Sequence, residues 1–282
     1  PGVSRTLRRR QPDRTDRPVV ATCRGRAAER MEAFVRPVPR LNMVSSPLSP
    51  ADSTVAGDRA VTAVLVVSGL GLGAGVALVL ALSVLLVGVG LDPSPLALLV
   101  ISLVSIQGVA FGGVALLYLR FRGRPVTSVG VRLPSVRELL IVVAGYAMAF
   151  IAAITGAIVI GITGAPAGEN QVAEFASTDP SVLLWLIPAS FLLIGPGEEL
   201  LFRGIVQGRL RETFDRVAGV VLASALFAAV HFAAFTGGAG GRLVTIAVLF
   251  FPALVFGAVY ELTDNLVVPA LVHGAYNATL FA

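Results

Sequence analysis

The uncharged run SVLLWLIPASFLLIGPG, residues 181–197, continues directly into Glu198 and Glu199, and Arg203 follows after three more apolar residues. A helix needs about 20 predominantly apolar residues to cross a bilayer. The stretch therefore predicts a membrane-spanning helix that takes two carboxylates and an arginine into the membrane. Ionisable side chains are costly at that depth, and where they occur they usually mark a functional site.

Long apolar runs also flank this stretch, so the chain is 55% hydrophobic and only 14% charged. Soluble domains carry about a quarter charged residues. We predict an all-α fold, a polytopic membrane helical bundle of about seven transmembrane helices, with three helices in residues 59–180 and a four-helix core in residues 181–282. The other runs cover residues 60–91, 95–119, 139–163, 217–235, 243–260 and 266–281.

The N-terminal segment differs from the rest of the chain in charge. Residues 1–42 hold 11 arginines and four acidic residues, whereas the remainder holds 11 arginines and 13 acidic residues. We expect residues 1–58 to be a disordered, arginine-rich segment, part of which is not translated if Met43 is the true start. Basic segments are attracted to anionic lipid; we expect the lipid bilayer as a partner and no nucleic acid. Cys23 is the only cysteine, so no disulfide can form within one chain.

Arginine placement predicts the orientation in the cell membrane, because arginine-rich loops stay in the cytoplasm. Arginines crowd the segment before the first run and the loops that follow the second and fourth runs. Residues 164–180 instead carry three acidic residues and no arginine. We therefore expect a multi-pass protein with a cytoplasmic N-terminus, an external 164–180 loop and an external C-terminus.

The Gly-Pro-Gly triplet at residues 195–197 is a poor helix interior, because proline removes a backbone donor and glycine costs about 1 kcal/mol. Proline does suit the first turn of a helix. We therefore expect the span to be broken here, with both glutamates in the first turn of its second half. Glu199 and Arg203 are four residues apart on one helix face, so we expect them to pair. Glu198 points about 100° away and is the unpaired carboxylate.

Both histidines lie in other apolar runs, each with a partner four residues away. The ring of Phe227 can pack against His231, and His273 with Asn277 can present hydrogen-bond donors to one point. Such donors suit a developing oxyanion, although polar groups also bond helices together in membranes. At 1.5 Å per residue, Glu198, the histidines and Asn277 lie roughly 12–23 Å from the predicted cytoplasmic boundary. We expect this layer to open towards the cytoplasm.

In order, the motifs Glu-Glu-x-x-x-Arg at 198–203, Phe-x-x-x-His at 227–231 and His-x-x-x-Asn at 273–277 resemble those of the CPBP family, also called the Abi family. These are intramembrane proteases related to the CAAX prenyl endopeptidase. The resemblance covers about residues 181–282, which would make the four-helix core catalytic. It implies a glutamic endopeptidase in which a glutamate and a histidine activate water while a histidine and an asparagine stabilise the oxyanion. The implied catalytic residues are Glu198, Glu199, His231, His273 and Asn277, with Arg203 and Phe227 as structural support.

We therefore predict a CAAX-type membrane endopeptidase that acts on a peptide or protein substrate, such as a prenylated peptide, a leader peptide or a membrane-protein tail. We expect no cofactor and no metal, since the His-Glu-x-x-His pattern is missing; a metal-dependent version would use the same residues as ligands. Two non-enzymatic alternatives stay open. One is a proton-coupled transporter, in which buried glutamate and histidine form a relay, and the other is a bacteriocin-immunity protein that binds a partner.

Overall fold

The computed structural model describes residues 2, 50–172 and 180–282. Apart from Gly2, the arginine-rich segment up to residue 49 lies outside the described residues. The predicted disorder of this segment, the proposed start at Met43 and the position of Cys23 therefore lie outside them as well. The expected boundary at residue 58 is wrong. Residues 50–58, which we assigned to the disordered segment, belong to helix α2 (Pro50–Gly88). A proline suits the first helical turn, where its missing N–H has no helical partner to lose.

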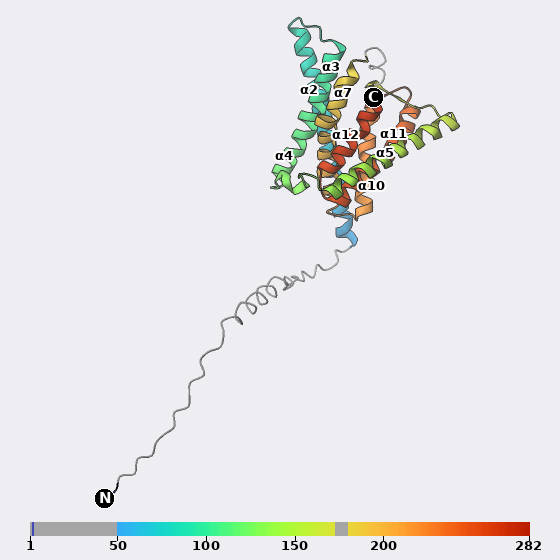
Figure 1. Ribbon diagram of the computed structural model, residues 1–282. Helices are drawn as coiled ribbons and strands as arrows, with labels where there is room; N and C mark the ends of the chain where they lie inside the picture. The colour runs from blue at the N-terminus through green and yellow to red at the C-terminus, as the bar shows by residue number, and fades with distance from the viewer. Residues whose placement is uncertain (1, 3–49, 173–179) are drawn as a thin grey trace. The chain divides into compact units, whose positions relative to one another are not determined.

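Six helices within the described residues are long and apolar enough to cross a membrane, which confirms the predicted all-α membrane bundle (Figure 1). The long first run forms the single helix α2, so it is one span and not two. The remaining elements follow in chain order: α3 (Pro95–Leu103), η1 (Val104–Gly112), α4 (Gly113–Phe121), η2 (Val126–Val129), α5 (Val136–Thr163), β1 (Glu169–Asn170), α7 (Val182–Ala189), η3 (Ser190–Ile194), α8 (Gly195–Glu199), η4 (Leu200–Gln207), α9 (Gly208–Leu210), α10 (Arg216–Val230), η5 (His231–Ala234), β2 (Phe235–Thr236), α11 (Ala239–Thr263) and α12 (Val267–Phe281).

The seventh predicted helix forms as α12, but it is shorter than the six spans. Its 15 residues extend about 22 Å at 1.5 Å per residue, less than the roughly 30 Å hydrocarbon core of a bilayer. α12 packs against α5, α11 and the fourth span, and it lies between α7 and α5 in Figure 1. Much of α12 is therefore surrounded by protein, which suits the polar His273 and Asn277 that it contains.

The fourth span is not broken at the Gly-Pro-Gly triplet, so that expectation is wrong. One continuous helix runs from Val182 to Leu210, and Ile194 and Leu200, which flank α8, keep right-handed helical backbone angles. α8 lies between two π-helical stretches, η3 and η4. Such stretches shift the backbone hydrogen-bond pattern, and this shift accommodates a proline that cannot donate a bond.

Close helix packing, rather than a break, explains the two glycines of the triplet. A Cβ atom at Gly197 would lie 2.2 Å from the backbone oxygen of Gln107 in η1. One at Gly195 would lie 2.7 Å from the backbone oxygen of Ala270 in α12. The triplet thus lets the second span and α12 approach the fourth span directly beside the two glutamates.

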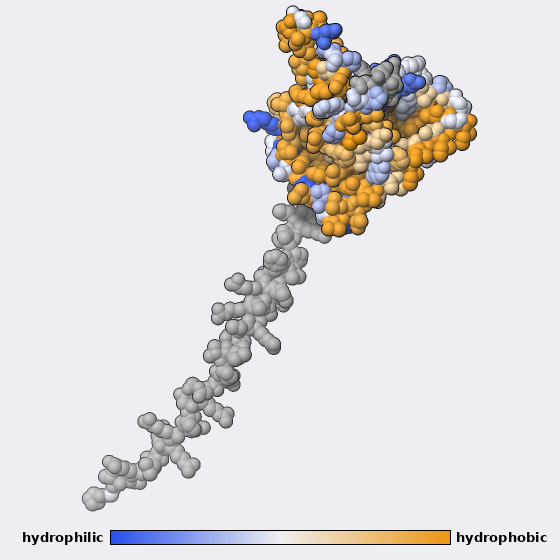
Figure 2. Space-filling view, turned by 45° about the horizontal axis from the view of Figure 1, so that its top comes forward, coloured by the Kyte–Doolittle hydropathy of each residue, from blue (hydrophilic) through white to orange (hydrophobic). Residues whose placement is uncertain are grey.

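A small antiparallel ladder joins the loop after α5 to the end of the fifth span. β1 pairs with β2, with Glu169 opposite Thr236 and Asn170 opposite Phe235. The sides of the bundle are apolar, and Figure 2 shows hydrophobic residues over most of the visible face of the helices. Large side chains such as Leu140 and Leu192 are 67% and 74% exposed, so this surface suits contact with lipid rather than water.

Candidate active site

Glu198 and Glu199 end helix α8, in the middle of the fourth span, and both are buried. Glu198 is 3% exposed and Glu199 is 0% exposed. Adjacent helical residues point about 100° apart, so the two carboxylates face different neighbours. Their environments differ accordingly.

Glu199 accepts hydrogen bonds from two buried side chains, those of Arg203 and His273. Arg203 Nε donates to Oε2 at 2.9 Å, and His273 Nδ1 donates to Oε1 at 2.9 Å. The guanidinium carbon of Arg203 also lies 5.0 Å from the centre of the Phe227 ring. The structure therefore contains the predicted Glu199–Arg203 pair and adds His273, which the sequence did not connect to Glu199. This contact joins the fourth span to α12.

Glu198 faces the Nε2 atoms of both histidines. Its Oε2 atom lies 3.7 Å from His231 Nε2 and 3.8 Å from His273 Nε2. Both separations are too long for a direct hydrogen bond. Oε2 is buried and has no hydrogen-bond partner among the described residues. Glu198 is therefore the unpaired carboxylate that the sequence predicted.

A hydrogen bond at Nδ1 orients each of the two imidazole rings. His231 Nδ1 lies 2.8 Å from the backbone oxygen of Phe227. A carbonyl oxygen can only accept, so Nδ1 of His231 holds a proton. His273 Nδ1 likewise donates to Glu199. In both rings Nε2 is the atom left for proton exchange, and both Nε2 atoms face Glu198.

Aromatic rings pack around the polar groups. The centre of the Phe227 ring lies 4.6 Å from that of His231, as the spacing predicts, and 5.7 Å from that of His273. Phe256 of α11 stacks on His273 with ring centres 4.7 Å apart and planes 19° apart. Phe256 lies in an ordinary apolar run, so the sequence offered no signal to single it out.

The polar groups face a cavity of about 610 Å³. Glu198, both histidines and Asn277 all line it, so the structure brings the predicted polar groups together. Most of the other side chains in the wall are apolar. Gln107 of η1 is a polar residue of the wall that sequence reasoning missed. A signal for it did exist, because Gln107 is the only Asn, Gln or charged residue in the run 95–119.

The cavity extends from these polar groups towards the end of the bundle that holds the β1–β2 ladder. Asn170, Phe235 and Phe281 line it at that end. On the other side, the large side chains of Phe202 and Arg203 are fully buried and fill the space towards the arginine-rich loops. The expectation that the site opens on the arginine-rich side is therefore wrong.

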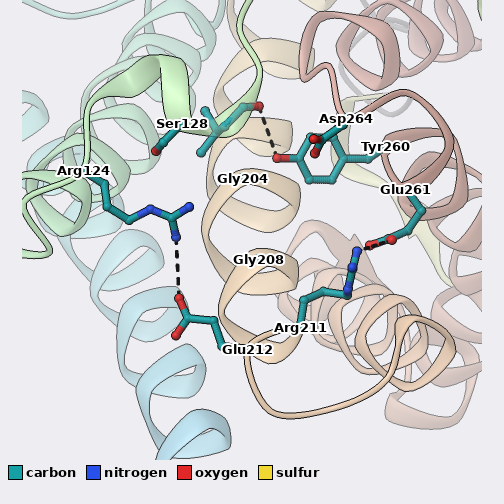
Figure 3. A pocket seen from close by; sticks show the side chains of 10 residues that line it. Arg124, Ser128, Gly204, Gly208, Arg211, Glu212, Tyr260, Glu261 and Asp264 are labelled. Carbon is teal, nitrogen blue, oxygen red and sulfur yellow. Dashed lines mark hydrogen bonds and ion pairs between the residues drawn. The ribbon is translucent and has the colours of Figure 1, made fainter. Parts of the chain in front are cut away.

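A separate polar pocket of about 250 Å³ lies at the arginine-rich end of the bundle (Figure 3). Arg124 points across it to Glu212, at 3.5 Å, and Arg211 pairs with Glu261. Four of the five charged side chains that line this pocket thus form ion pairs across it, and the fifth is Asp264. Glu198 and the two histidines of the larger cavity do not line this pocket, so it is distinct from the candidate active site.

Metal binding was a second possible use of the same residues. In the part of the chain that the structure describes, no group of three or more His, Cys, Asp or Glu side chains is arranged to hold a metal ion. The metal-free character of the site stays a prediction that chelation can test.

Comparison with known proteins identifies the part of the chain that holds the site. Residues 180–279 match the family model described as type II CAAX prenyl endopeptidase Rce1-like. No curated protein and no solved structure matches the chain. All three motifs lie within the matched segment. Residues 180–279 are therefore similar to the Rce1-like family of type II CAAX prenyl endopeptidases, the resemblance that the motifs predicted.

Proposed function

We propose that this protein is an intramembrane endopeptidase in which Glu198 and His231 activate water for attack on a peptide bond. The position of Glu198 Oε2 supports the proposal most directly. This oxygen is buried without a hydrogen-bond partner among the described residues, and it faces two imidazole nitrogens at 3.7 and 3.8 Å. The family match of residues 180–279 supports the same class of reaction.

The reaction begins with attack of the water oxygen on the carbonyl carbon of the scissile bond. Glu198 takes one proton from the water, assisted by His231 Nε2, while the new C–O bond forms. The carbonyl oxygen becomes an oxyanion and accepts hydrogen bonds from His273 Nε2–H and the Asn277 amide. When the intermediate collapses, the C–N bond breaks and the proton passes to the leaving amine. The products are a carboxylic acid and an amine, and the second proton of the water leaves with ionisation of the acid, which gives a carboxylate and an ammonium group.

Glu199 has a positioning role in this mechanism. In this mechanism His273 donates two hydrogen bonds, one from Nε2 to the oxyanion and one from Nδ1 to Glu199. Only the protonated ring, the imidazolium, carries a hydrogen on both nitrogens. The buried carboxylate supplies the compensating negative charge and a charge-assisted hydrogen bond. Arg203 holds the second oxygen of Glu199 at 2.9 Å, which fixes the carboxylate. Glu199 and Arg203 thus act on the reacting atoms only through His273.

The cavity favours a substrate with apolar character. A mostly apolar wall around a few polar groups is typical of sites that bind apolar ligands. The family description points to prenylated C-terminal peptides, and leader peptides or membrane-protein tails are further members of the proposed substrate class.

We propose that the substrate reaches Glu198 from the β1–β2 end of the cavity. In the orientation that the arginine distribution favours, with a cytoplasmic N-terminus, that end faces outward.

Hydrolysis by the purified protein in liposomes tests the proposal. The probes are internally quenched peptides that end in an S-farnesylated cysteine and three further residues, beside unprenylated peptides of the same sequence. Mass spectrometry identifies the cleaved bond. Glu198→Gln should lower the cleavage rate about 100-fold or more, because the amide keeps the shape of the side chain but cannot take the proton. Thermal unfolding of this variant should stay close to that of the wild type.

Two outcomes would contradict the proposal in different ways. Near-normal cleavage by Glu198→Gln would show that another group is the base. A well-folded wild-type protein that cleaves none of the peptides would favour the non-enzymatic alternatives, the transporter or the immunity protein.

A further inference from the structure

Gln107 lines the catalytic cavity but lies outside the segment that matches the family model. It is part of η1, the π-helical middle of the second span, and it shares the cavity wall with Glu198 and His273. Within the described residues, it is the one polar side chain that the first three spans contribute to this wall. π-Helical turns inside α-helices are frequent at functional sites.

The carboxamide oxygen of Gln107 has no hydrogen-bond partner in the described part of the chain. Oε1 is buried and unpaired among the described residues. In this cavity wall only Glu198 Oε2 shares that condition. A buried acceptor without a donor is unfavourable, and most such groups in native proteins are paired. A donor from a ligand bound in the cavity would satisfy this acceptor.

The backbone of Gln107 is anchored beside the catalytic carboxylate. Gly197 approaches it so closely that a Cβ atom at residue 197 would lie 2.2 Å from the Gln107 backbone oxygen. Glu198 is the next residue in α8. The side chain of Gln107 thus starts from a point that packing fixes relative to Glu198.

We propose that Gln107 binds the main chain of the substrate beside the scissile bond, with its carboxamide oxygen accepting a hydrogen bond from a substrate peptide N–H. The inference rests on the proposed function and adds the residue that places the substrate. A carboxamide offers an acceptor and two donors, which complement the N–H and C=O of a peptide group. Recognition of this kind depends on the extended main chain of the peptide and not on its side chains. Peptides of different sequence therefore bind in the same register relative to Glu198.

Replacement of the glutamine by an apolar side chain of similar size tests this role. Gln107→Met should lower kcat/KM about 10-fold, mainly through a higher KM, because a bond made in both the ground state and the transition state is lost. The thermal midpoint should stay the same or rise, since an unpaired buried oxygen is removed. Ser68→Ala is the matched control, because Ser68 Oγ is also buried and unpaired among the described residues but lies outside the cavity wall. It should leave the kinetics unchanged.

Ester-substituted peptides test the hydrogen bond itself. In the farnesylated quenched peptide, each peptide N–H other than that of the scissile bond is replaced in turn by an ester oxygen. The wild type should lose about fivefold in kcat/KM at one position. Gln107→Met should show no further loss at that position, because both changes remove the same bond.

Each contrary result has a defined meaning. Equal ester penalties at every position in the wild type overturn the inference, even if Gln107→Met fails to fold. Normal kinetics of Gln107→Met overturn it as well, while wild-type cleavage leaves the proposed function intact. If the wild type cleaves no peptide, the proposed function fails and the inference fails with it.

Discussion

At the scale of single residues, two adjacent glutamates have opposite surroundings. Glu199 accepts hydrogen bonds from Arg203 and His273 at 2.9 Å each, whereas Glu198 Oε2 has no hydrogen-bond partner among the described residues. The 100° rotation between neighbouring helical residues produces this difference. One carboxylate thus has two buried hydrogen-bond partners, and the other has an oxygen free for the proton that the proposed mechanism takes from water.

Arg203→Ala should destabilise the protein strongly. It leaves Glu199 as a buried carboxylate that has lost its arginine, a change that typically costs about 3–5 kcal/mol. We expect a lower yield, a lower midpoint of thermal unfolding, and reduced cleavage because His273 loses its fixed partner. Arg209→Ala is the matched control on the same span, because the Arg209–Glu212 pair is partly exposed and such pairs contribute about 1 kcal/mol or less. Equal midpoints for the two variants would contradict the buried pair.

Chelation should not inhibit cleavage, because the proposed mechanism uses Glu198 and His231 to activate water directly. The measurement compares the rate of peptide hydrolysis before and after dialysis against EDTA and 1,10-phenanthroline, with the metal content determined by mass spectrometry. Stoichiometric zinc in the active protein, with activity lost on its removal and restored by its return, would overturn the metal-free mechanism.

At the scale of elements, the Gly-Pro-Gly triplet is a packing device in a continuous helix. Local propensity alone favours a break at residues 195–197, because both residue types are poor in a helix interior. Two neighbouring helices override this preference, since the backbones of Gln107 and Ala270 occupy the space that larger side chains would need. The triplet thus holds the second span and α12 against the residues that precede Glu198.

Gly197→Ala should therefore lower both stability and activity. The added methyl group would meet the Gln107 backbone oxygen at 2.2 Å, and overpacking of this kind typically costs about 1–3 kcal/mol. Gly208→Ala serves as the control on the same span, because its nearest neighbour for a new Cβ, the backbone oxygen of Arg203, lies at 3.9 Å. Thermal unfolding and hydrolysis rates should separate the two variants; equal behaviour would mean that the second span does not press on Gly197.

At the scale of the whole molecule, the position of the cavity supports the proposed side of substrate entry. The cavity extends to Asn170, Phe235 and Phe281, while the interior towards the arginine-rich loops is filled by side chains such as Phe202 and Arg203. The bundle therefore has the proposed active-site cavity on one side of the glutamates and a small polar pocket at the other end.

Cysteine labelling measures the orientation and the access separately. After removal of Cys23, a cysteine at Thr127 should react in intact cells only with membrane-permeant reagents, and one at Asn170 should also react with impermeant ones. A cysteine at Ala234, in the cavity wall, should follow the behaviour of Asn170. Labelling of Thr127 from outside would invert the orientation. A cysteine at Ala234 that followed Thr127 would contradict access from the β1–β2 end, whichever way the protein is inserted.

The sequence by itself determined the membrane-bundle class, the approximate spans, the family resemblance of residues 180–279 and the pairs within one helix. These features depend on apolar run length and on four-residue spacing, which are local properties of the chain. The Glu199–Arg203 pair and the Phe227–His231 contact follow from that spacing. Only the tertiary structure decided that His273 binds Glu199, that Phe256 stacks on His273, that Gln107 joins the cavity wall, and which end of the bundle the cavity reaches. These outcomes depend on which helices become neighbours, and helix packing between residues as far apart as 107 and 197 leaves no local periodicity in the sequence.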